Sequence, residues 1–219
     1  MSVELNKFVD HTLLKPDATV DQIIQLCEEA ITYNFAAVCV NPCYAGLAAN
    51  LLAGSKVKTA TVIGFPLGAT LSECKAFEVQ AALEAKVDEL DMVINLGALK
   101  SGQWDAVLQD IKAVVAAAED KLVKVIVETA LLDLDEKRRV CELVLSSGAH
   151  YIKTSTGFGP GGATLEDIIL FKSLIGDTDL CGIKASGGIK TRQQALALLN
   201  AGATRIGTSA GVTIMNTKL

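Results

Sequence analysis

The sequence has few of the residues that hold metal ions or form disulfides. It contains only two histidines, His11 and His150, and none of its six cysteines are spaced as CxxC. Structural zinc sites and disulfide frameworks depend on such residues in close spacing, so we expect neither of them. We expect structural roles for both histidines, and buried free thiols in a reducing compartment.

Blocks of positive charge and long apolar runs are absent as well. The net charge is −5, which argues against a nucleic acid or a membrane surface as a partner. No segment approaches the ~20 apolar residues that a membrane-spanning helix needs, and the first ten residues, MSVELNKFVD, lack the apolar centre of a secretory signal. We therefore expect a cytoplasmic protein with no membrane partner.

The chain is rich in apolar residues instead. Of its 219 residues 50% are hydrophobic and 21% are charged, a balance that suits one large core or two small ones. No linker or change of composition divides the chain, so we predict a single domain over residues 1–219.

Short β-rich segments alternate with amphipathic helical segments. The eight predicted strands cover 9–14, 36–40, 58–63, 89–94, 122–128, 150–154, 180–184 and 204–208. The predicted helices cover 20–33, 42–53, 71–86, 103–119, 135–147, 164–175 and 191–200. Hydroxyl residues followed three positions later by Glu or Gln predict capping boxes at TVDQ (19–22), TLSE (70–73) and TRQQ (191–194).

An internal repeat supports a closed barrel. LSSGAHYIKTS (145–155) and LNAGATRIGTS (199–209) share the pattern L-x-x-G-A-x-x-I-x-T-S, which indicates a repeated βα unit. Eight such units predict an α/β fold of the (β/α)8 TIM barrel type. The rival is an open, doubly wound sheet, which often has GxGxxG after its first strand; HTLLKPDAT stands there instead.

Two lysines lie at the ends of neighbouring predicted strands, Lys153 on the sixth and Lys184 on the seventh. Barrel active sites lie at the carboxyl ends of the strands. A second ammonium about 6 Å away lowers the pKa of an amine by about two units at an effective dielectric of ~20, and burial adds to this. We therefore predict an uncharged, nucleophilic Lys153 and a charged Lys184 that tunes it. A single lysine would more often be the solvated end of a strand. Two lysines on neighbouring strands, each followed by a small polar loop, favour an active site instead.

Acidic and further basic residues near these strand ends are weighed in the same way. Asp91 lies within an apolar run, and a buried aspartate needs a cation or donors. The residues alone leave open whether it forms a structural ion pair or transfers protons. Lys124 and Glu128 share one face of the fifth strand, so one of them is a candidate to enter the site, but we place both behind it. Lys15 is within reach of the mouth of the barrel and is expected to be a solvated loop residue.

Glycine-rich loops follow the seventh and eighth strands, at SGG (186–188) and GTSAG (207–211). Barrel enzymes often hold a phosphate there, because glycine lets backbone N–H groups approach an anion. We predict phosphate contacts from Thr156, Gly157, Gly187, Gly188 and Ser209.

Several motifs, in order along the chain, resemble one enzyme family, the deoxyribose-phosphate aldolases. They are VDHTLLKPDAT, VCVNP, VIGFPLG, DELDMVINLGAL, YIKTSTGF, GIKASGGI and RIGTSAG, which together span nearly the whole chain. The combination of KTSTG with KASGGI downstream is the most specific part of this resemblance.

The resemblance implies a lyase, a class I (Schiff-base) aldolase with no metal and no cofactor. Such enzymes cleave 2-deoxy-D-ribose 5-phosphate reversibly to D-glyceraldehyde 3-phosphate and acetaldehyde in deoxyribonucleoside catabolism. It assigns the imine to Lys153, the second lysine to Lys184 and the proton shuttle to Asp91. Some members have a lysine directly after KTSTG, where this chain has Phe158, which puts phosphate affinity in question.

The sequence leaves three alternatives open: a class I aldolase for another sugar, a sugar-phosphate isomerase, and an inactive barrel that serves as a binding protein. The oligomeric state is open too, and an exposed face of the helix at 103–119 would suit a homodimer.

Overall fold

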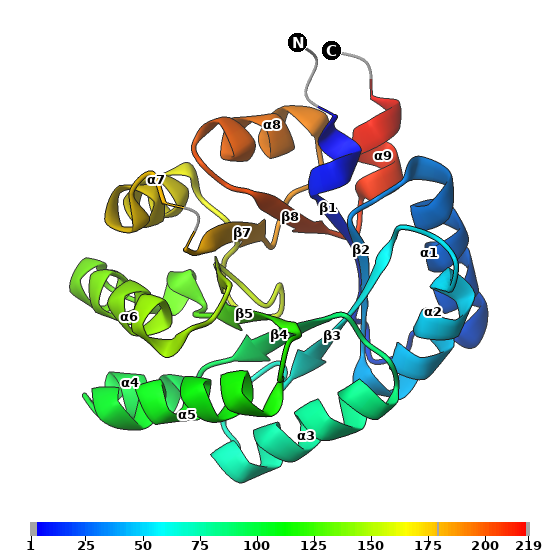
Figure 1. Ribbon diagram of the computed structural model, residues 1–219. Helices are drawn as coiled ribbons and strands as arrows, with labels where there is room; N and C mark the ends of the chain where they lie inside the picture. Colours follow the sequence, from blue (N-terminus) through cyan, green and yellow to red (C-terminus); the bar gives the residue numbers. More distant parts are fainter. Residues whose placement is uncertain (1–3, 179, 218–219) are drawn as a thin grey trace.

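The structure, a computed structural model, describes residues 4–178 and 180–217. Eight parallel strands follow one another around a closed barrel (Figure 1). They are β1 (Val9–Leu13), β2 (Ala37–Val40), β3 (Lys58–Ile63), β4 (Glu89–Val93), β5 (Leu122–Ile126), β6 (Tyr151–Lys153), β7 (Gly182–Ser186) and β8 (Arg205–Thr208). Strand β1 pairs with both β2 and β8, which closes the barrel and confirms the predicted (β/α)8 fold.

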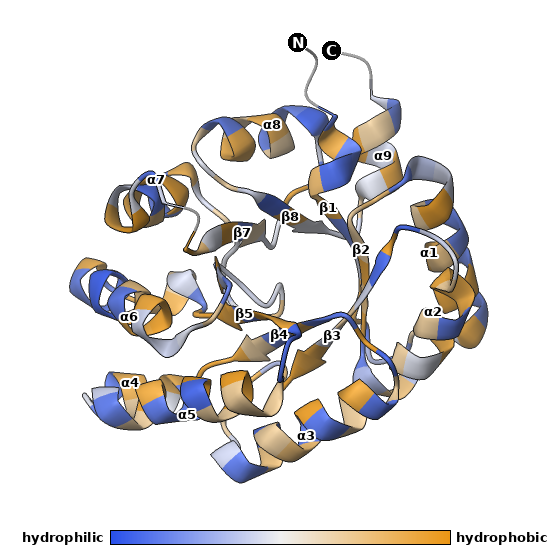
Figure 2. Ribbon diagram, in the orientation of Figure 1, coloured by the Kyte–Doolittle hydropathy of each residue, from blue (hydrophilic) through white to orange (hydrophobic). Residues whose placement is uncertain are grey.

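Helices form a ring outside the strands (Figure 1). They are α1 (Val20–Tyr33), α2 (Ala45–Leu52), α3 (Ser72–Glu84), α4 (Leu96–Lys100), α5 (Trp104–Ala117), α6 (Leu134–Ser147), α7 (Leu165–Ile175), α8 (Arg192–Asn200) and α9 (Gly211–Asn216), with short 3-10 turns η1 (Leu5–Phe8), η2 (Pro42–Tyr44) and η3 (Thr129–Leu131). The barrel strands are largely apolar, and blue and orange alternate along the helices (Figure 2), as expected for helices with one face on the barrel. None of the helices described is long and apolar enough to cross a membrane.

The predicted helix starts are correct at two of three capping boxes. Thr19 with Gln22 and Thr191 with Gln194 make both reciprocal hydrogen bonds. The prediction at Thr70 is wrong, because α3 begins at Ser72 with Leu71 as its N-cap. Tertiary contact accounts for the difference: the Ser72 hydroxyl lies 2.8 Å from Asp110 Oδ1 on α5.

A buried ion pair joins α3 to α5. Lys75 is fully buried, and its Nζ lies 2.5 Å from Asp110 Oδ2 and 2.9 Å from the carbonyl oxygen of Val93 at the end of β4. A buried ammonium needs such partners, since desolvation costs several kcal/mol. The pair therefore fixes two outer helices against the carboxyl end of the barrel.

Breaking this pair from one side should cost much more than removing it whole. We expect Lys75→Met to lower the free energy of unfolding by about 3–5 kcal/mol, because it leaves a buried carboxylate unpaired, and Lys75→Met with Asp110→Leu to cost far less. Urea unfolding measures both. Lys58→Met is the control, because Lys58 pairs with Asp88 on the surface at 3.4 Å and should cost less than about 1 kcal/mol. Equal losses for Lys58→Met and Lys75→Met would contradict the account.

All six cysteines are free thiols. Four are buried, as expected, whereas Cys43 and Cys74 are exposed. Cys39 on β2 packs inside the barrel with Ala37, Ala60 and Val62, and burial raises the pKa of its thiol to about 11. One side of the barrel interior is therefore apolar and uncharged.

Candidate active site

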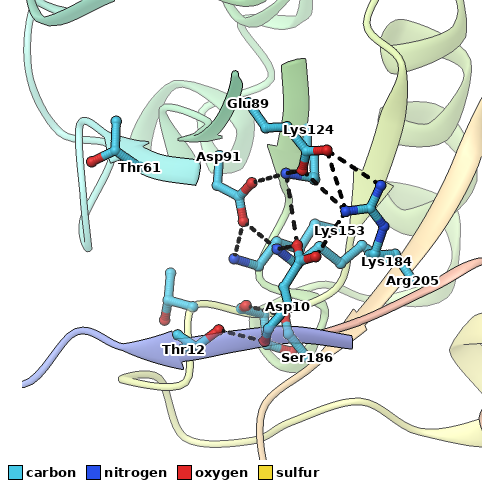
Figure 3. A network of polar contacts seen from close by, with 12 residues as sticks. Asp10, Thr12, Thr61, Glu89, Asp91, Lys124, Lys153, Lys184, Ser186 and Arg205 are labelled. Atoms are coloured by element: carbon cyan, nitrogen blue, oxygen red, sulfur yellow. Dashed lines mark hydrogen bonds and ion pairs between the residues drawn. The ribbon is translucent and has the colours of Figure 1, made fainter. Parts of the chain in front are cut away.

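The other side of the barrel interior is lined with charged residues (Figure 3). Because strand residues alternate between faces, β1 and the strands from β4 to β8 each place one or two charged side chains inward. These are Asp10 on β1, Glu89 and Asp91 on β4, Lys124 on β5, Lys153 on β6, Lys184 on β7 and Arg205 on β8. All but Arg205 are buried, so they interact in a medium that screens charge poorly.

Asp91 is the centre of this cluster. Its Oδ2 lies 2.6 Å from Lys153 Nζ and 2.7 Å from Lys184 Nζ, and its Oδ1 accepts a hydrogen bond from Lys124 Nζ at 2.7 Å. Lys153 and Lys184 are direct neighbours across β6 and β7. The structure thus brings together the two lysines and the aspartate that the sequence singled out.

Lys124 lies closer to the centre of the site than its position in the sequence predicts. It lies in contact with Asp91 rather than behind the site, and its Nζ lies 2.7 Å from Glu89 Oε2. Arg205 closes the network, with Nη1 at 2.8 Å from Asp10 Oδ1 and 3.1 Å from Glu89 Oε2. Asp10 also accepts a hydrogen bond from Lys184.

The pKa values of the two lysines are shifted in opposite directions. Burial lowers the pKa of Lys153, and the positive charge of Lys184 lowers it further. The Asp91 carboxylate acts in the opposite direction and raises it. Burial also disfavours the charge of Lys184, but the carboxylates of Asp10 and Asp91 outweigh it and raise its pKa. The predicted directions agree with the structure. The predicted order of causes does not, since burial has a larger effect on Lys153 than repulsion by Lys184.

The balance of buried charges in the cluster also favours a neutral Lys153. Burial opposes ionisation of Asp91, but the charges of three neighbouring lysines outweigh it and hold the pKa of this carboxyl well below its usual range. Three carboxylates (Asp10, Glu89, Asp91) face three cations other than Lys153 (Lys124, Lys184, Arg205). A charged Lys153 would therefore add a buried positive charge without a counterpart, which favours its neutral form.

A cavity of about 350 Å³ opens beside Lys153. Its walls include all five residues predicted to contact phosphate, Thr156, Gly157, Gly187, Gly188 and Ser209. Two exposed lysines, Lys15 and Lys190, line it as well, so Lys15 faces the cavity rather than open solvent alone. The cavity joins an amine with a lowered pKa to an end with backbone donors and cations, as a substrate with a carbonyl and an anionic group requires.

Residues 5–216 match the DeoC/LacD family of aldolases. The chain belongs to this family. It is 54% identical to a deoxyribose-phosphate aldolase of Streptococcus equi subsp. zooepidemicus, over 97% of this chain and 96% of that one. It is 56% identical to a deoxyribose-phosphate aldolase of Halalkalibacterium halodurans, over 99% and 96%.

Solved structures of aldolases have the same fold. The aldolase QR15 superposes with a TM-score of 0.92 at 39% identity, over 97% of this chain and 94% of that one. The tetrameric deoxyribose phosphate aldolase of Aeropyrum pernix gives a TM-score of 0.89 at 35% identity, over 96% and 89%.

One predicted phosphate contact, Thr156, is engaged elsewhere, and the neighbouring Phe158 offers no polar group. Thr156 donates both its backbone N–H, at 3.1 Å, and its hydroxyl to Glu128 Oε2, so neither donor is available to an anion. Phe158 lies edge-on to Phe65, with ring centroids 5.3 Å apart, and forms an apolar part of the cavity wall.

Both histidines make structural contacts. His11 Nε2 lies 2.7 Å from Glu29 Oε2, and His150 Nδ1 accepts the N–H of Val123 at 3.1 Å. Over residues 4–178 and 180–217, no three His, Cys, Asp or Glu side chains gather in a way that could hold a metal ion.

Proposed function

We propose that Lys153 is the Schiff-base residue of this aldolase, and that the enzyme cleaves 2-deoxy-D-ribose 5-phosphate to D-glyceraldehyde 3-phosphate and acetaldehyde. One observation carries the proposal. Lys153 is a buried amine with a lowered pKa that lines a cavity and contacts a buried carboxylate at 2.6 Å.

The chemistry begins with the neutral amine of Lys153. It attacks C1 of the open-chain aldehyde to form a carbinolamine, which loses water to give a protonated imine. The iminium accepts electrons, so the C2–C3 bond breaks as a base removes the proton of the C3 hydroxyl. Glyceraldehyde 3-phosphate leaves, and protonation and hydrolysis of the remaining enamine release acetaldehyde and restore the amine.

Asp91 and Lys184 are placed to move the protons of these steps. Asp91 Oδ2 lies within hydrogen-bond distance of both amines, so a proton can pass between them without a large movement. Lys124 holds Oδ1 of the same carboxylate and fixes its orientation. Lys184 remains charged and favours the neutral form of Lys153.

The phosphate group is assigned to the other end of the cavity. The backbone donors of Gly187, Gly188 and Ser209, with Gly157 beside them, suit an anion, and Lys15 and Lys190 add positive charge nearby. This anchoring holds the substrate in one direction, with its aldehyde carbon at Lys153. Thr156 shapes the wall of the site rather than donating to the phosphate.

Self-association and location belong to this proposal too. A homodimer through α5 remains a hypothesis that light scattering tests. In the described chain, the exposed large apolar side chains include none on α5 but include Leu67, Leu71 and Phe77, which makes the region of α3 the better candidate. Six free thiols suit a reducing cytoplasm.

A coupled assay for released glyceraldehyde 3-phosphate tests the function directly. Borohydride reduction in the presence of acetaldehyde should convert the imine into a stable secondary amine, seen as one added ethyl group in the intact mass. Release without reductive labelling would point to an enzyme without an imine. Labelling without release would point to an aldolase for another sugar.

Removing the charge of Lys184 should shift the pH dependence of the reaction upward. In Lys184→Met one cause of the lowered pKa of Lys153 is gone, so this pKa rises and less neutral amine remains at pH 7. The acidic limb of kcat/KM should therefore move to higher pH by about one to two units. Lys190→Met, at the rim of the cavity, is the control and should leave the limb in place. An unmoved limb in Lys184→Met would remove Lys184 from the tuning role.

A further inference from the structure

Glu128 is a buried carboxylate outside the charged cluster. It follows β5 and is only 3% exposed. Its Oε2 accepts two hydrogen bonds from one residue, the backbone N–H and the hydroxyl of Thr156. The hydroxyl oxygen of Thr156 accepts the N–H of Phe158 at 3.0 Å. A single carboxylate therefore fixes the backbone and the side chain of the residue at the start of the cavity wall.

The backbone around Glu128 is built for this contact. Glu128 has a φ of +54°, a left-handed conformation that is uncommon for a residue other than glycine. The loop after β6 packs tightly on the same turn. A Cβ added at Gly159 would lie 2.8 Å from the carboxyl carbon of Glu128, and one at Gly161 would lie 2.6 Å from Ala130 Cβ. The glycines of this loop are therefore needed for close approach to residues 128–130.

Glu128 is also energetically unexpected. Its Oε1 is buried with no hydrogen-bond partner among the described residues, and no described ion pair reaches it. A buried carboxylate held by only two donors loses more in desolvation than an apolar side chain would. Because burying the Glu128 side chain costs more free energy than burying an apolar side chain, we look for a role of Glu128 other than stabilising the fold.

The loop that Glu128 holds carries one wall of the cavity. Thr156, Gly157 and Phe158 line the cavity together with Lys153. The loop is tied to the opposite wall as well, because the Ser186 hydroxyl donates to the Ser155 carbonyl at 2.6 Å and the Ala163 N–H donates to the Gly187 carbonyl at 3.1 Å. The position of Thr156 thus sets the distance between Lys153 and the glycine loops.

We propose that Glu128 is a positioning residue for the aldolase reaction. It acts through Thr156 on the wall at residues 156–158, and holds this wall in the position in which the anionic end of the substrate is bound. Glu128 itself does not touch the substrate. This inference rests on the proposed function and goes beyond it, because it assigns substrate placement to a side chain outside the cavity.

Steady-state kinetics of Glu128→Ala with two substrates tests this role. With 2-deoxy-D-ribose 5-phosphate, KM should rise about tenfold or more, since small misplacements weaken a preorganised site, while kcat should change less than about threefold. With 2-deoxy-D-ribose, which has no phosphate to place, kcat/KM should change less than about twofold. Thr156→Val should have the same signature, and Thr156→Ser, which keeps the hydroxyl, should restore KM to within about twofold of the parent.

Two further variants separate positioning from stability. Thr129→Val is the matched control, because the Thr129 hydroxyl is buried beside Glu128 with no partner among the described residues; its KM should not change. In the double variant Glu128→Ala with Thr156→Val, the effects on KM should not add, because each change removes the same hydrogen bond between the Thr156 hydroxyl and Glu128. Thr156→Val also stands in for Glu128→Ala if the latter does not fold.

An unchanged KM for the phosphorylated substrate in both Glu128→Ala and Thr156→Val would overturn the proposal, and a lowered melting temperature alone would make Glu128 structural. Failure of the proposed function looks different. In that case the parent protein itself would release no glyceraldehyde 3-phosphate.

Discussion

Lys153→Ala is expected to abolish the imine and to lower kcat/KM by at least about 10⁴-fold, because Lys153 is the cavity-lining lysine whose pKa burial lowers. The remaining lysine of the pair, Lys184, keeps its charge through Asp10 and Asp91 and cannot substitute. After acetaldehyde and borohydride, the parent should gain one ethyl group that peptide mapping places on Lys153, and the variant should gain none.

The matched variant is Lys153→Arg, which keeps a long basic side chain but cannot form an imine. It should be as inactive as Lys153→Ala. Lys58→Ala, on the outer surface, should be labelled and active like the parent. Labelling of Lys153→Ala at the parent level would remove Lys153 from the mechanism, and a label mapped to Lys184 would reverse the two assignments.

Asp91→Asn is expected to change rate and pH dependence in opposite senses. The maximal rate should fall by about 10²–10⁴-fold, because the variant cannot relay protons between the two amines. The charge of Asp91 raises the pKa of Lys153, so its removal should lower that pKa further. The acidic limb of imine formation should therefore move to lower pH while the plateau drops. Single-turnover labelling with acetaldehyde across pH measures both effects.

Stability provides the control for this variant. Asp91→Asn leaves two charged lysines with less counter-charge and should cost about 3–5 kcal/mol of unfolding free energy. Asp110→Asn, which affects another buried lysine pair, should also be destabilising but should leave kcat of the folded enzyme unchanged. A limb that moves to higher pH in Asp91→Asn would show that Asp91 does not set the titration of Lys153 through its charge.

The fold could be predicted from local patterns because each βα unit repeats them. Apolar runs and capping residues placed most elements within two residues of their bounds. The errors arose where contacts distant in sequence decide. The Ser72 hydroxyl donates a hydrogen bond to Asp110, and α3 begins at Ser72 rather than at residue 71. The strand predicted to end at residue 128 ends at Ile126, because Glu128 adopts a left-handed conformation beneath a loop from the next unit.

The site was predictable only in part, for a related reason. Lys153 and Lys184 are predicted because each closes a predicted strand before a small polar loop, although β7 itself continues past Lys184 to Ser186. Lys124 was undervalued because it lies within an apolar strand, and only the register shows it directly opposite Asp91. The dominance of burial over repulsion in the pKa of Lys153 depends on how completely the interior excludes water, which no spacing reveals. The role of Glu128 depends on a hydrogen bond to a residue 28 positions away.

The ion network that fills the barrel below Lys153 affects how the substrate enters the site and in which order the products leave it. Asp10, Lys124 and Lys184 are completely buried and fill the interior on one side of Lys153, while the cavity lies on its other side, among the loops after β6, β7 and β8. Under the proposed mechanism, the two-carbon fragment stays covalently attached to Lys153 after the C2–C3 bond breaks, while the three-carbon phosphate lies toward the opening of the cavity. Departure is thus sequential, with the larger product leaving first and acetaldehyde last, an order that product-inhibition patterns report.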